Sequence, residues 1–256
     1  MGIVVKKFGG SSVATPEKIK AVAARVLREK GPEDQVVVTV SAMGDTTDDL
    51  ITLAKQVTGA TRSREMDMLL STGEQVSIAL MAMAFADLGC PAVSLTGMQA
   101  GIRTNSVHMK GRITDMNPDR VFEELSRGNV VVVAGFQGVS PNGDITTLGR
   151  GGSDTTAVAL AGALNAKVCE IYTDVDGVYS ADPRVVKSAR KMKEITYNEM
   201  LEMARLGAGV MQPRSVELGS RYGVPIHVRS TFTTEPGTII REGYTVEEKE
   251  FVVRGV

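Results

Sequence analysis

The sequence predicts an α/β protein built around a mainly parallel sheet, and three observations point to that class. Short apolar runs rich in β-branched residues alternate with longer segments of helical periodicity, as expected when helices connect parallel strands. Residues 130–133 are four consecutive valines, which is typical of a strand buried on both faces. The length of 256 residues is enough to bury a large core in one domain or in two small ones.

In order along the chain, strands are expected at residues 3–8, 35–41, 92–95, 129–136, 167–173, 225–229 and 237–241. Helices are expected at residues 16–30, 46–57, 63–88, 118–127, 154–165 and 197–222. The strands are the β-branched runs, and the helices are the segments with apolar residues at helical spacing. Because an exposed edge strand would alternate polar and apolar residues, we expect the valine strand in the middle of the sheet.

Two segments depart from this alternation. Pro141, Asn142 and Gly143 predict a turn, so the chain around them is expected to form a small hairpin that projects from the sheet edge, either as a lid or as a plain connection. After residue 241 the sequence becomes strongly charged. We therefore expect one domain over residues 1–241 and a connector over residues 242–256.

Composition excludes several classes of partner. Lysine and arginine number 29 and aspartate and glutamate 30, so no overall field attracts nucleic acid or an anionic membrane. Cys90 and Cys169 are isolated among apolar residues, which predicts buried thiols in a reducing cytoplasm and no disulfide or zinc site. No targeting pattern is present at the N-terminus, and no apolar run approaches the ~20 residues of a membrane span. These features predict a cytoplasmic protein.

The first candidate site is a glycine turn near the N-terminus. The apolar run at residues 3–5 leads into Lys7, Gly9, Gly10 and Ser11, and a helical pattern follows. Glycines let backbone N–H groups approach a ligand closely, and a helix N-terminus favours anions. The turn is therefore a candidate phosphate cradle with Lys7 beside it, although a solvated strand end has the same residues.

A second glycine-rich segment precedes the helix expected at residues 154–165. Arg150 lies inside this turn and Ser153 and Asp154 follow it. An arginine together with free N–H donors suits a carboxylate or a phosphate. Ser153 and Asp154 are equally good helix caps, a structural role that is compatible with binding.

A third segment starts at the carboxyl end of the strand expected at residues 167–173. Ligands of open α/β sheets gather outside the carboxyl ends of strands, so this segment is a candidate nucleotide pocket with Tyr179 for packing and Arg184 for phosphate. An acidic surface loop would have a similar composition.

The fourth candidate combines Ser41 and Thr47, near the end of the second strand, with Glu74 in a long apolar helix. Hydroxyl groups at a strand end can bind a substrate carboxylate. A glutamate buried among apolar residues needs a cationic partner, which a substrate ammonium would supply. The alternative for Glu74 is a solvent-facing position. His108 and His227 are each isolated, and the sequence contains no Walker A motif, protein-kinase loop or nucleophile elbow.

Taken together, six segments closely resemble the catalytic domain of the aspartate kinases, in the amino acid kinase family. They are KFGGSS at 7–12, SAMGDTTDDL at 41–50, LLSTGEQVS at 69–77, TGMQAGI at 96–102, LGRGGSD at 148–154 and YTDVDGVYSADPR at 172–184. Their order and spacing match over roughly residues 3–241. The resemblance implies a three-layer αβα sandwich around a mainly parallel eight-stranded sheet, and ATP-dependent phosphorylation of the L-aspartate side chain to 4-phospho-L-aspartate, the first step toward lysine, threonine and methionine.

The resemblance also implies roles by position, with aspartate bound by the N-terminal part of the domain and ATP by the C-terminal part. Lys7 would contact the transferring phosphoryl group, with Gly9, Gly10 and Ser11 beside the phosphates and Asp154 orienting Lys7 or a magnesium-bound phosphate. Aspartate would be held by Ser41, Thr47, Glu74, Arg150 and Ser153. The ATP site would be lined by Thr173, Asp174, Tyr179 and Arg184. Mg²⁺ would be carried by ATP, and no protein ligand is assigned to it.

The chemistry is consistent with these roles. An aspartate side chain has a reference pKa of about 3.9, so the attacking carboxylate is already ionised at neutral pH and needs no general base. Bringing that carboxylate toward a polyphosphate is electrostatically unfavourable. Catalysis would therefore depend on positioning and on cations, namely Lys7, Mg²⁺ and backbone N–H donors.

Two departures from the family pattern are visible. Many relatives carry lysine at the position of Gly209 and histidine at that of Gln212, so no nucleotide contact is assigned there. Aspartate kinases also usually continue past a segment like residues 251–256 into paired ACT domains that bind inhibitory amino acids and support a homodimer or higher oligomer. The chain is expected to lack these domains, and with them feedback by lysine or threonine, whether it is an excised domain or a short natural form.

Two rival interpretations remain at the level of sequence. In the first, the chain is a different member of the same superfamily, one that phosphorylates N-acetylglutamate, glutamate or carbamate. Glu74 argues against an N-acetylated acceptor, because such an acceptor has no ammonium group for it to bind. A nucleotide-binding module without turnover would bind ATP and transfer nothing.

Overall fold

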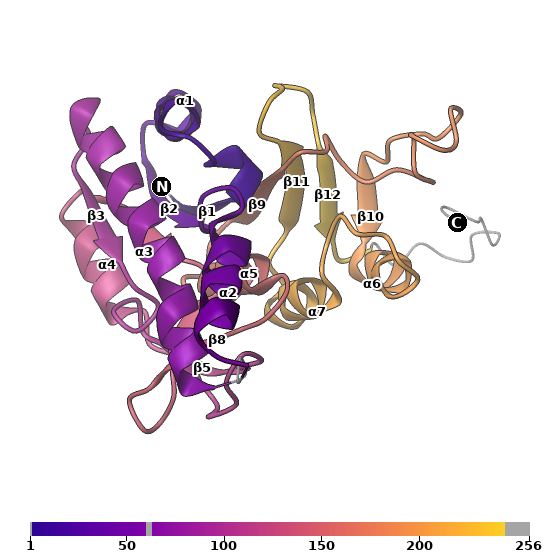
Figure 1. The fold of residues 1–256 in the computed structure, drawn as a ribbon. Coiled ribbons are helices and arrows are strands. Elements are labelled where there is room, and N and C mark those ends of the chain that lie inside the picture. The colour runs from indigo at the N-terminus through magenta and orange to yellow at the C-terminus, as the bar shows by residue number, and fades with distance from the viewer. Residues whose placement is uncertain (1, 60–62, 244–256) are drawn as a thin grey trace.

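An eight-stranded sheet forms the middle layer of the protein in the computed structural model, which describes residues 2–59 and 63–243. The strand order is β10-β12-β11-β9-β1-β2-β6-β3 (Figure 1). The bounds are β1 (Gly2–Phe8), β2 (Asp34–Val40), β3 (Ala92–Leu95), β6 (Val130–Ala134), β9 (Val168–Thr173), β10 (Glu194–Thr196), β11 (Ile226–Ser230) and β12 (Thr238–Arg241). The six strands from β11 to β3 are parallel, whereas β12 is antiparallel to β11 and β10 follows the direction of β12. The prediction of a mainly parallel α/β sheet is confirmed.

Helices cover both faces of this sheet. One face carries α1 (Pro16–Glu29) and α3 (Arg64–Asp87), and the other carries α4 (Asp119–Ser126), α5 (Gly152–Ala163), α6 (Tyr197–Arg205) and α7 (Pro213–Tyr222). Helix α2 (Thr46–Val57) packs outside α3 (Figure 1). The layers are therefore helix, sheet and helix, as the resemblance implied.

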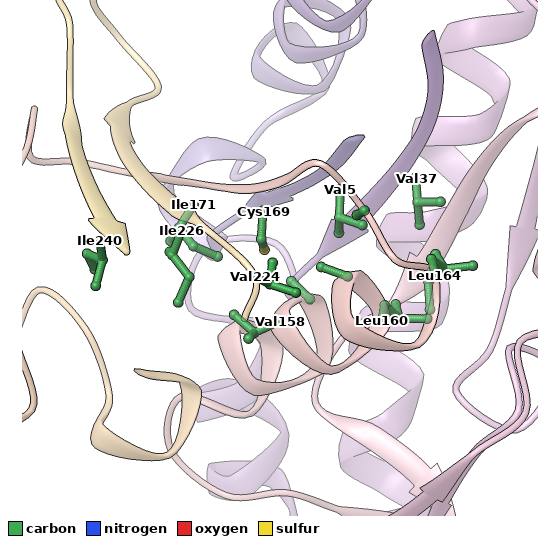
Figure 2. Close-up of a cluster of buried hydrophobic side chains, with 14 of the residues drawn as sticks. Val5, Val37, Val158, Leu160, Leu164, Cys169, Ile171, Val224, Ile226 and Ile240 are labelled. Carbon is green, nitrogen blue, oxygen red and sulfur yellow. The ribbon is translucent and has the colours of Figure 1, made fainter. Parts of the chain in front are cut away.

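Alternation along the strands divides the core into two halves. In β2, Val36, Val38 and Val40 pack with α1 and α3, whereas Val37 points to the opposite face, because successive side chains of a strand point to opposite faces. Figure 2 shows the second half, where Val5, Val37 and Ile171 of the sheet face Val158 and Leu160 of α5. Burial on both faces explains why these strands are continuous apolar runs.

A second, smaller sheet lies beyond the carboxyl end of β6. Its order is β5-β4-β7-β8, with bounds β4 (Ile102–Thr104), β5 (Ile113–Met116), β7 (Gln137–Val139) and β8 (Ile145–Thr147). The predicted hairpin is present as the antiparallel pair β7 and β8, but it joins this second sheet through β4 and does not project from an edge of the main sheet. Strands β4, β5 and β10 span only three or four residues, too few to show a period of two in the sequence.

Several other expectations need correction. The helix expected at residues 197–222 is two helices, α6 and α7, because the chain breaks at Gly207, whose φ is +115°. Strand β6 lies one position from the edge and is shielded there by β3, so it is an inner strand but not the central one. Cys169 is buried, but Cys90 is only partly buried. The connector expected at residues 242–256 lies almost wholly outside the described residues.

Helix α3 is long and apolar enough to cross a membrane by length and composition alone. In this fold it is a core helix that packs against α1, β3, β6 and β8. Four of its buried residues are the polar Asp67, Ser71, Glu74 and Ser77, which are unfavourable in contact with lipid. All four form hydrogen bonds within the protein. Those of Asp67 and Glu74 are described below, Ser71 Oγ donates to Met68 O at 2.9 Å, and Ser77 Oγ donates to Gly73 O at 3.2 Å.

Candidate active site

The candidate site lies at the carboxyl edge of the parallel strands. Lys7 is near the end of β1, opposite Thr39 of β2 on one side and Ile171 of β9 on the other. The chain then crosses between strand ends, since Ser41 N donates to Phe8 O at 3.1 Å and Gly135 N donates to Val40 O at 3.0 Å. Because the ends of parallel strands share one edge, segments distant in sequence meet there.

Lys7 and Asp154 form the central ion pair. Lys7 Nζ lies 2.6 Å from Asp154 Oδ1, and both side chains are largely buried. Asp154 is in the first turn of α5, so the sheet supplies the cation and the helix supplies its carboxylate. The pair holds the ammonium at the strand end, where Lys7 was expected to meet a phosphoryl group.

The glycine turn after β1 packs closely against the loop that follows β2. A Cβ at Gly10 would lie 2.9 Å from Ala42 O, and a Cβ at Gly9 would lie 3.3 Å from Lys7 Nζ. Gly10 opens the 3₁₀ turn η1 (Gly10–Ser12), and its carbonyl accepts from Gly44 N at 3.1 Å. Ser11 is exposed on this turn. A side chain at Gly9 would crowd the Lys7 ammonium, so the turn fits a cradle for phosphate.

Among the acidic residues near this edge, Glu74 has the most strongly shifted pKa. Its side chain is on α3 and the residue is only 2% exposed. One carboxylate oxygen, Oε1, accepts from Ala42 N at 3.2 Å, and the other, Oε2, has no partner within the described part of the chain. Burial raises the pKa of Glu74 to about 8. A buried carboxyl group with one free oxygen is suited to receive a cation from a ligand.

Glu74 reaches Ala42 because of the glycine that precedes it. A Cβ at Gly73 would lie 2.9 Å from the Ala42 Cβ, so α3 can approach the loop after β2 only without a side chain there. Ser41 is in this loop and Thr47 is in the first turn of α2, and both are partly exposed. The structure therefore places Ser41, Thr47 and Glu74 around the loop that follows β2, and their role in binding aspartate stays a prediction.

The N-terminus of α5 forms the opposite wall. Its N-cap is Gly151, with φ +67°, and no side chain caps the helix, so Ser153 and Asp154 are not the caps that the alternative interpretation proposed. Ser153 is buried against Gly135, where a Cβ would lie 2.7 Å from its Oγ. Arg150 is exposed in the turn before the helix. Uncapped N–H groups beside an arginine can bind an anion.

Phe136 was not predicted as part of this wall. Its φ is +68°, a conformation that is strained for a bulky residue. Phe136 N donates to Thr156 Oγ1 at 3.1 Å, and its ring packs so close to Gly152 that a Cβ there would lie 2.8 Å from a ring carbon. The hydrogen bond and the ring contact of Phe136 therefore hold the start of α5 beside the site.

The predicted nucleotide segment begins at the same edge but extends away from it. Thr173 ends β9, and its Oγ1 donates to Asp174 Oδ1 at 3.0 Å. Tyr179 Oη donates to Asp176 Oδ1 at 3.0 Å. The side chain of Arg184 is 89% exposed, and its guanidinium group pairs with Asp182. The end of β9 lies beside the glycine turn, since Tyr172 O is 4.0 Å from the position of a Cβ at Gly9, whereas the exposed Arg184 lies on the loop that follows β9.

The described residues contain no group of three His, Cys, Asp or Glu side chains that could hold a metal ion. Mg²⁺ binds proteins through one or two carboxylates and takes its other ligands from substrate phosphates and water. The site fits that mode, with Asp154 as the carboxylate nearest Lys7.

One anchoring group was missed from the sequence. Asp67 of α3 is fully buried and accepts from Thr147 Oγ1 at 2.5 Å and from His108 Nδ1 at 2.7 Å. His108, expected to be structural or on the surface, therefore has a structural partner. Asp67 precedes Glu74 by seven residues and so shares its helix face; this spacing was the signal in the sequence that marked it.

Comparison with known proteins agrees with this geometry. The pattern that defines the amino acid kinase family matches residues 2–230, and the chain belongs to that family. Among its relatives, the aspartokinase of Geobacillus stearothermophilus is 57% identical over all 256 residues of the chain. Aspartokinase 2 of Bacillus subtilis is 56% identical over the same length. The chain spans 63% and 62% of these two relatives.

Solved structures show the same fold. Aspartate kinase from Synechocystis aligns with a TM-score of 0.83 and 50% identity, over 96% of this chain and 40% of that one. Aspartokinase III of E. coli, in complex with aspartate and ADP, aligns with a TM-score of 0.84 and 28% identity, over 94% of this chain and 64% of that one. Carbamate kinase from Giardia lamblia, at 18% identity and a TM-score of 0.68, shares the fold alone.

Proposed function

We propose that the chain phosphorylates the side-chain carboxylate of L-aspartate with ATP, giving 4-phospho-L-aspartate. The observation that carries the proposal is the half-satisfied carboxyl group of Glu74, buried beside the same strand ends as the Lys7–Asp154 pair. The aspartokinase relatives and the aspartate and ADP bound to aspartokinase III support it.

Recognition of the acceptor needs both ends of an amino acid. Glu74 Oε2 would receive the ammonium, because a buried carboxylate is stabilised by an adjacent cation. Arg150 and the N–H groups at the start of α5 would bind the α-carboxylate. Ser41, Thr47 and Ser153 would position the molecule so that its side chain points to Lys7.

Transfer depends on the central cation. ATP with Mg²⁺ would supply the phosphoryl group, lying against Gly9, Gly10 and Ser11 with its nucleoside toward Thr173, Asp174 and Tyr179. Lys7 would neutralise charge on the transferring group while Asp154 keeps the ammonium in place. The side-chain carboxylate is its own nucleophile, so these residues need to orient the reactants and need not remove a proton.

The first test is ADP release with three acceptors: L-aspartate, L-glutamate and N-acetyl-L-glutamate. We expect release above the acceptor-free rate with L-aspartate only. Glu74→Gln keeps the shape of the side chain and removes its charge, and we expect it to raise KM for L-aspartate about 30-fold or more. Release with N-acetyl-L-glutamate that Glu74→Gln leaves unchanged would assign a different acceptor.

We further propose a homo-oligomer in the cytoplasm that serves amino-acid biosynthesis. An apolar stripe on α3 supports the oligomer: Val76, Leu80 and Met83 are spaced at one helix face, and Met83 is 65% exposed. An exposed apolar row of this kind is typical of a contact surface.

A further inference from the structure

A basic cavity shares Arg150 with the proposed acceptor site, and its other cationic residues have no role in the proposed reaction. Its volume is about 860 Å³, and it lies between the loop at residues 105–112, the turn at residues 148–150 and the first turn of α7. Among the described residues that line it, four are cationic, Lys110, Arg112, Arg150 and Arg214, and none is acidic. One α-carboxylate needs a single arginine, and Arg214 donates to backbone carbonyls, so Lys110 and Arg112 remain to be explained.

The loop that carries Lys110 and Arg112 connects β4 to β5 and is rigidly held. Besides the bonds from His108 and Thr147, Asp67 accepts from Met109 N, with both carboxylate oxygens at 3.1 Å. Gly111 N donates to Thr147 O at 2.8 Å. The backbone on either side of Lys110 is therefore fixed to α3 and β8. The cationic side chains of this loop extend from a backbone whose position is set before any ligand binds.

Arg214 ties the two walls of the cavity together. Its Nη1 donates to Leu148 O at 2.8 Å and its Nη2 donates to Gly111 O at 3.1 Å. Burial and the nearby Arg112 lower the pKa of Arg214, because these two cations repel each other. A bound anion would relieve that repulsion.

We propose that this cavity binds a phosphate-bearing anion through Lys110, Arg112 and Arg150, on a platform held by Asp67 and Arg214. A phosphate group carries more charge than a carboxylate and accepts several hydrogen bonds at once. The inference uses the proposed function only at Arg150, which the phosphate would share with the α-carboxylate of the acceptor. The two ligands would therefore weaken each other's binding. The source is either free phosphate or the phosphate group of a small metabolite.

Calorimetric titration of the full chain without ATP tests this proposal. Inorganic phosphate and O-phospho-L-serine are titrated at constant ionic strength into the wild type, Lys110→Ala/Arg112→Ala and Arg103→Ala. Arg103 is a matched control, because it is an exposed arginine of β4 that does not line the cavity. No turnover is involved, so a failure of the kinase proposal would remove only the competition by L-aspartate and would leave the binding of the probes unchanged.

We expect saturable binding of at least one of the two probes, weakened about tenfold or more by the double substitution, unchanged by Arg103→Ala, and weakened by added L-aspartate. Binding of inorganic phosphate assigns free phosphate as the source, and binding of O-phospho-L-serine alone assigns a phosphorylated metabolite. Absence of saturable binding by either probe, or equal binding by the double variant, would overturn the proposal.

Discussion

Lys6 and Lys7 are adjacent in sequence but serve opposite faces of the sheet. Lys7 points toward α5 and pairs with Asp154, whereas Lys6 points toward α1 and forms a buried ion pair with Glu170. Strand alternation separates the two ammonium groups. Only Lys7 lies with the glycine turn and the start of α5, so it is the one lysine of the pair placed for chemistry.

Substituting Lys7 tests its catalytic role. Because Lys7 would act on charge that develops during transfer, Lys7→Ala should lower kcat about 100-fold or more and change KM for L-aspartate only slightly. Steady-state kinetics measure both constants, with Lys20→Ala on the exposed side of α1 as the control. An equal loss in kcat and in aspartate affinity would contradict this role.

Glu74 should make stability depend on pH in an unusual direction. With its pKa raised to about 8 by burial, the folded protein holds a proton that the unfolded chain releases near the ordinary carboxyl pKa. The free energy of unfolding should therefore fall as pH rises from about 5 to 8, by up to ~1.4 kcal/mol per unit from this group. Urea denaturation at three pH values compares the wild type with Glu74→Gln, which should lack this component. Parallel pH profiles for both proteins would refute the assignment.

At the scale of elements, the approach of α3 to the loop after β2 positions the acceptor side of the site. Gly73→Ala would place a Cβ 2.9 Å from that of Ala42, so we expect a loss of about 1–3 kcal/mol in stability and a higher KM for L-aspartate. Gly59→Ala is the matched control, because no atom lies within 4 Å of the added Cβ. Thermal melts and acceptor kinetics check both effects, and equal behaviour of the two variants would count against the close contact.

Most of the main sheet was predictable because burial on both faces leaves continuous apolar runs, as at β6. The predicted α3 and β3 also agree closely with the observed Arg64–Asp87 and Ala92–Leu95. The second sheet was not predictable, since three-residue strands such as β4 depend on pairing partners distant in sequence.

The candidate site was predictable where backbone chemistry marks it. The adjacent Gly9 and Gly10 predict a turn, and Glu74 can be singled out because it is a charged residue within an apolar helix. Phe136 could not be identified, because its strained φ depends on the packing of α5 against β6. The spacing of Asp67 from Glu74 marks the shared helix face, but the role of Asp67 could not be identified, because its partners come from a distant loop and from β8.

For the whole molecule, the proposed site would divide into an acceptor side and a nucleotide side about Lys7. The ends of β2 and β6, with α3, lie on one side, and the ends of β9 and β11 lie on the other. Segments spanning most of the chain must therefore fold together before the two halves of the site exist, which fits a single domain.

The apolar stripe on α3, formed by Val76, Leu80 and Met83, is the proposed contact between copies of the chain. Val76→Glu/Met83→Glu should separate the proposed oligomer, because burying two carboxylates in an apolar contact is unfavourable. Light scattering after size-exclusion chromatography measures the mass, with Leu206→Glu as a control at an apolar residue that is 86% exposed elsewhere. A wild-type chain that is monomeric at micromolar concentration, or an oligomer that survives the double substitution, would exclude this stripe as the contact.

The proposed reaction forms an acyl phosphate on L-aspartate, and hydroxylamine traps this product as a hydroxamate. The chain is incubated with ATP, Mg²⁺ and hydroxylamine together with L-aspartate, L-glutamate or N-acetyl-L-glutamate, and the hydroxamate is quantified. We expect an ATP-dependent hydroxamate with L-aspartate only, and its near loss in Lys7→Ala. A hydroxamate formed with another acceptor in place of L-aspartate, or none with any acceptor from folded protein, would contradict the proposed function.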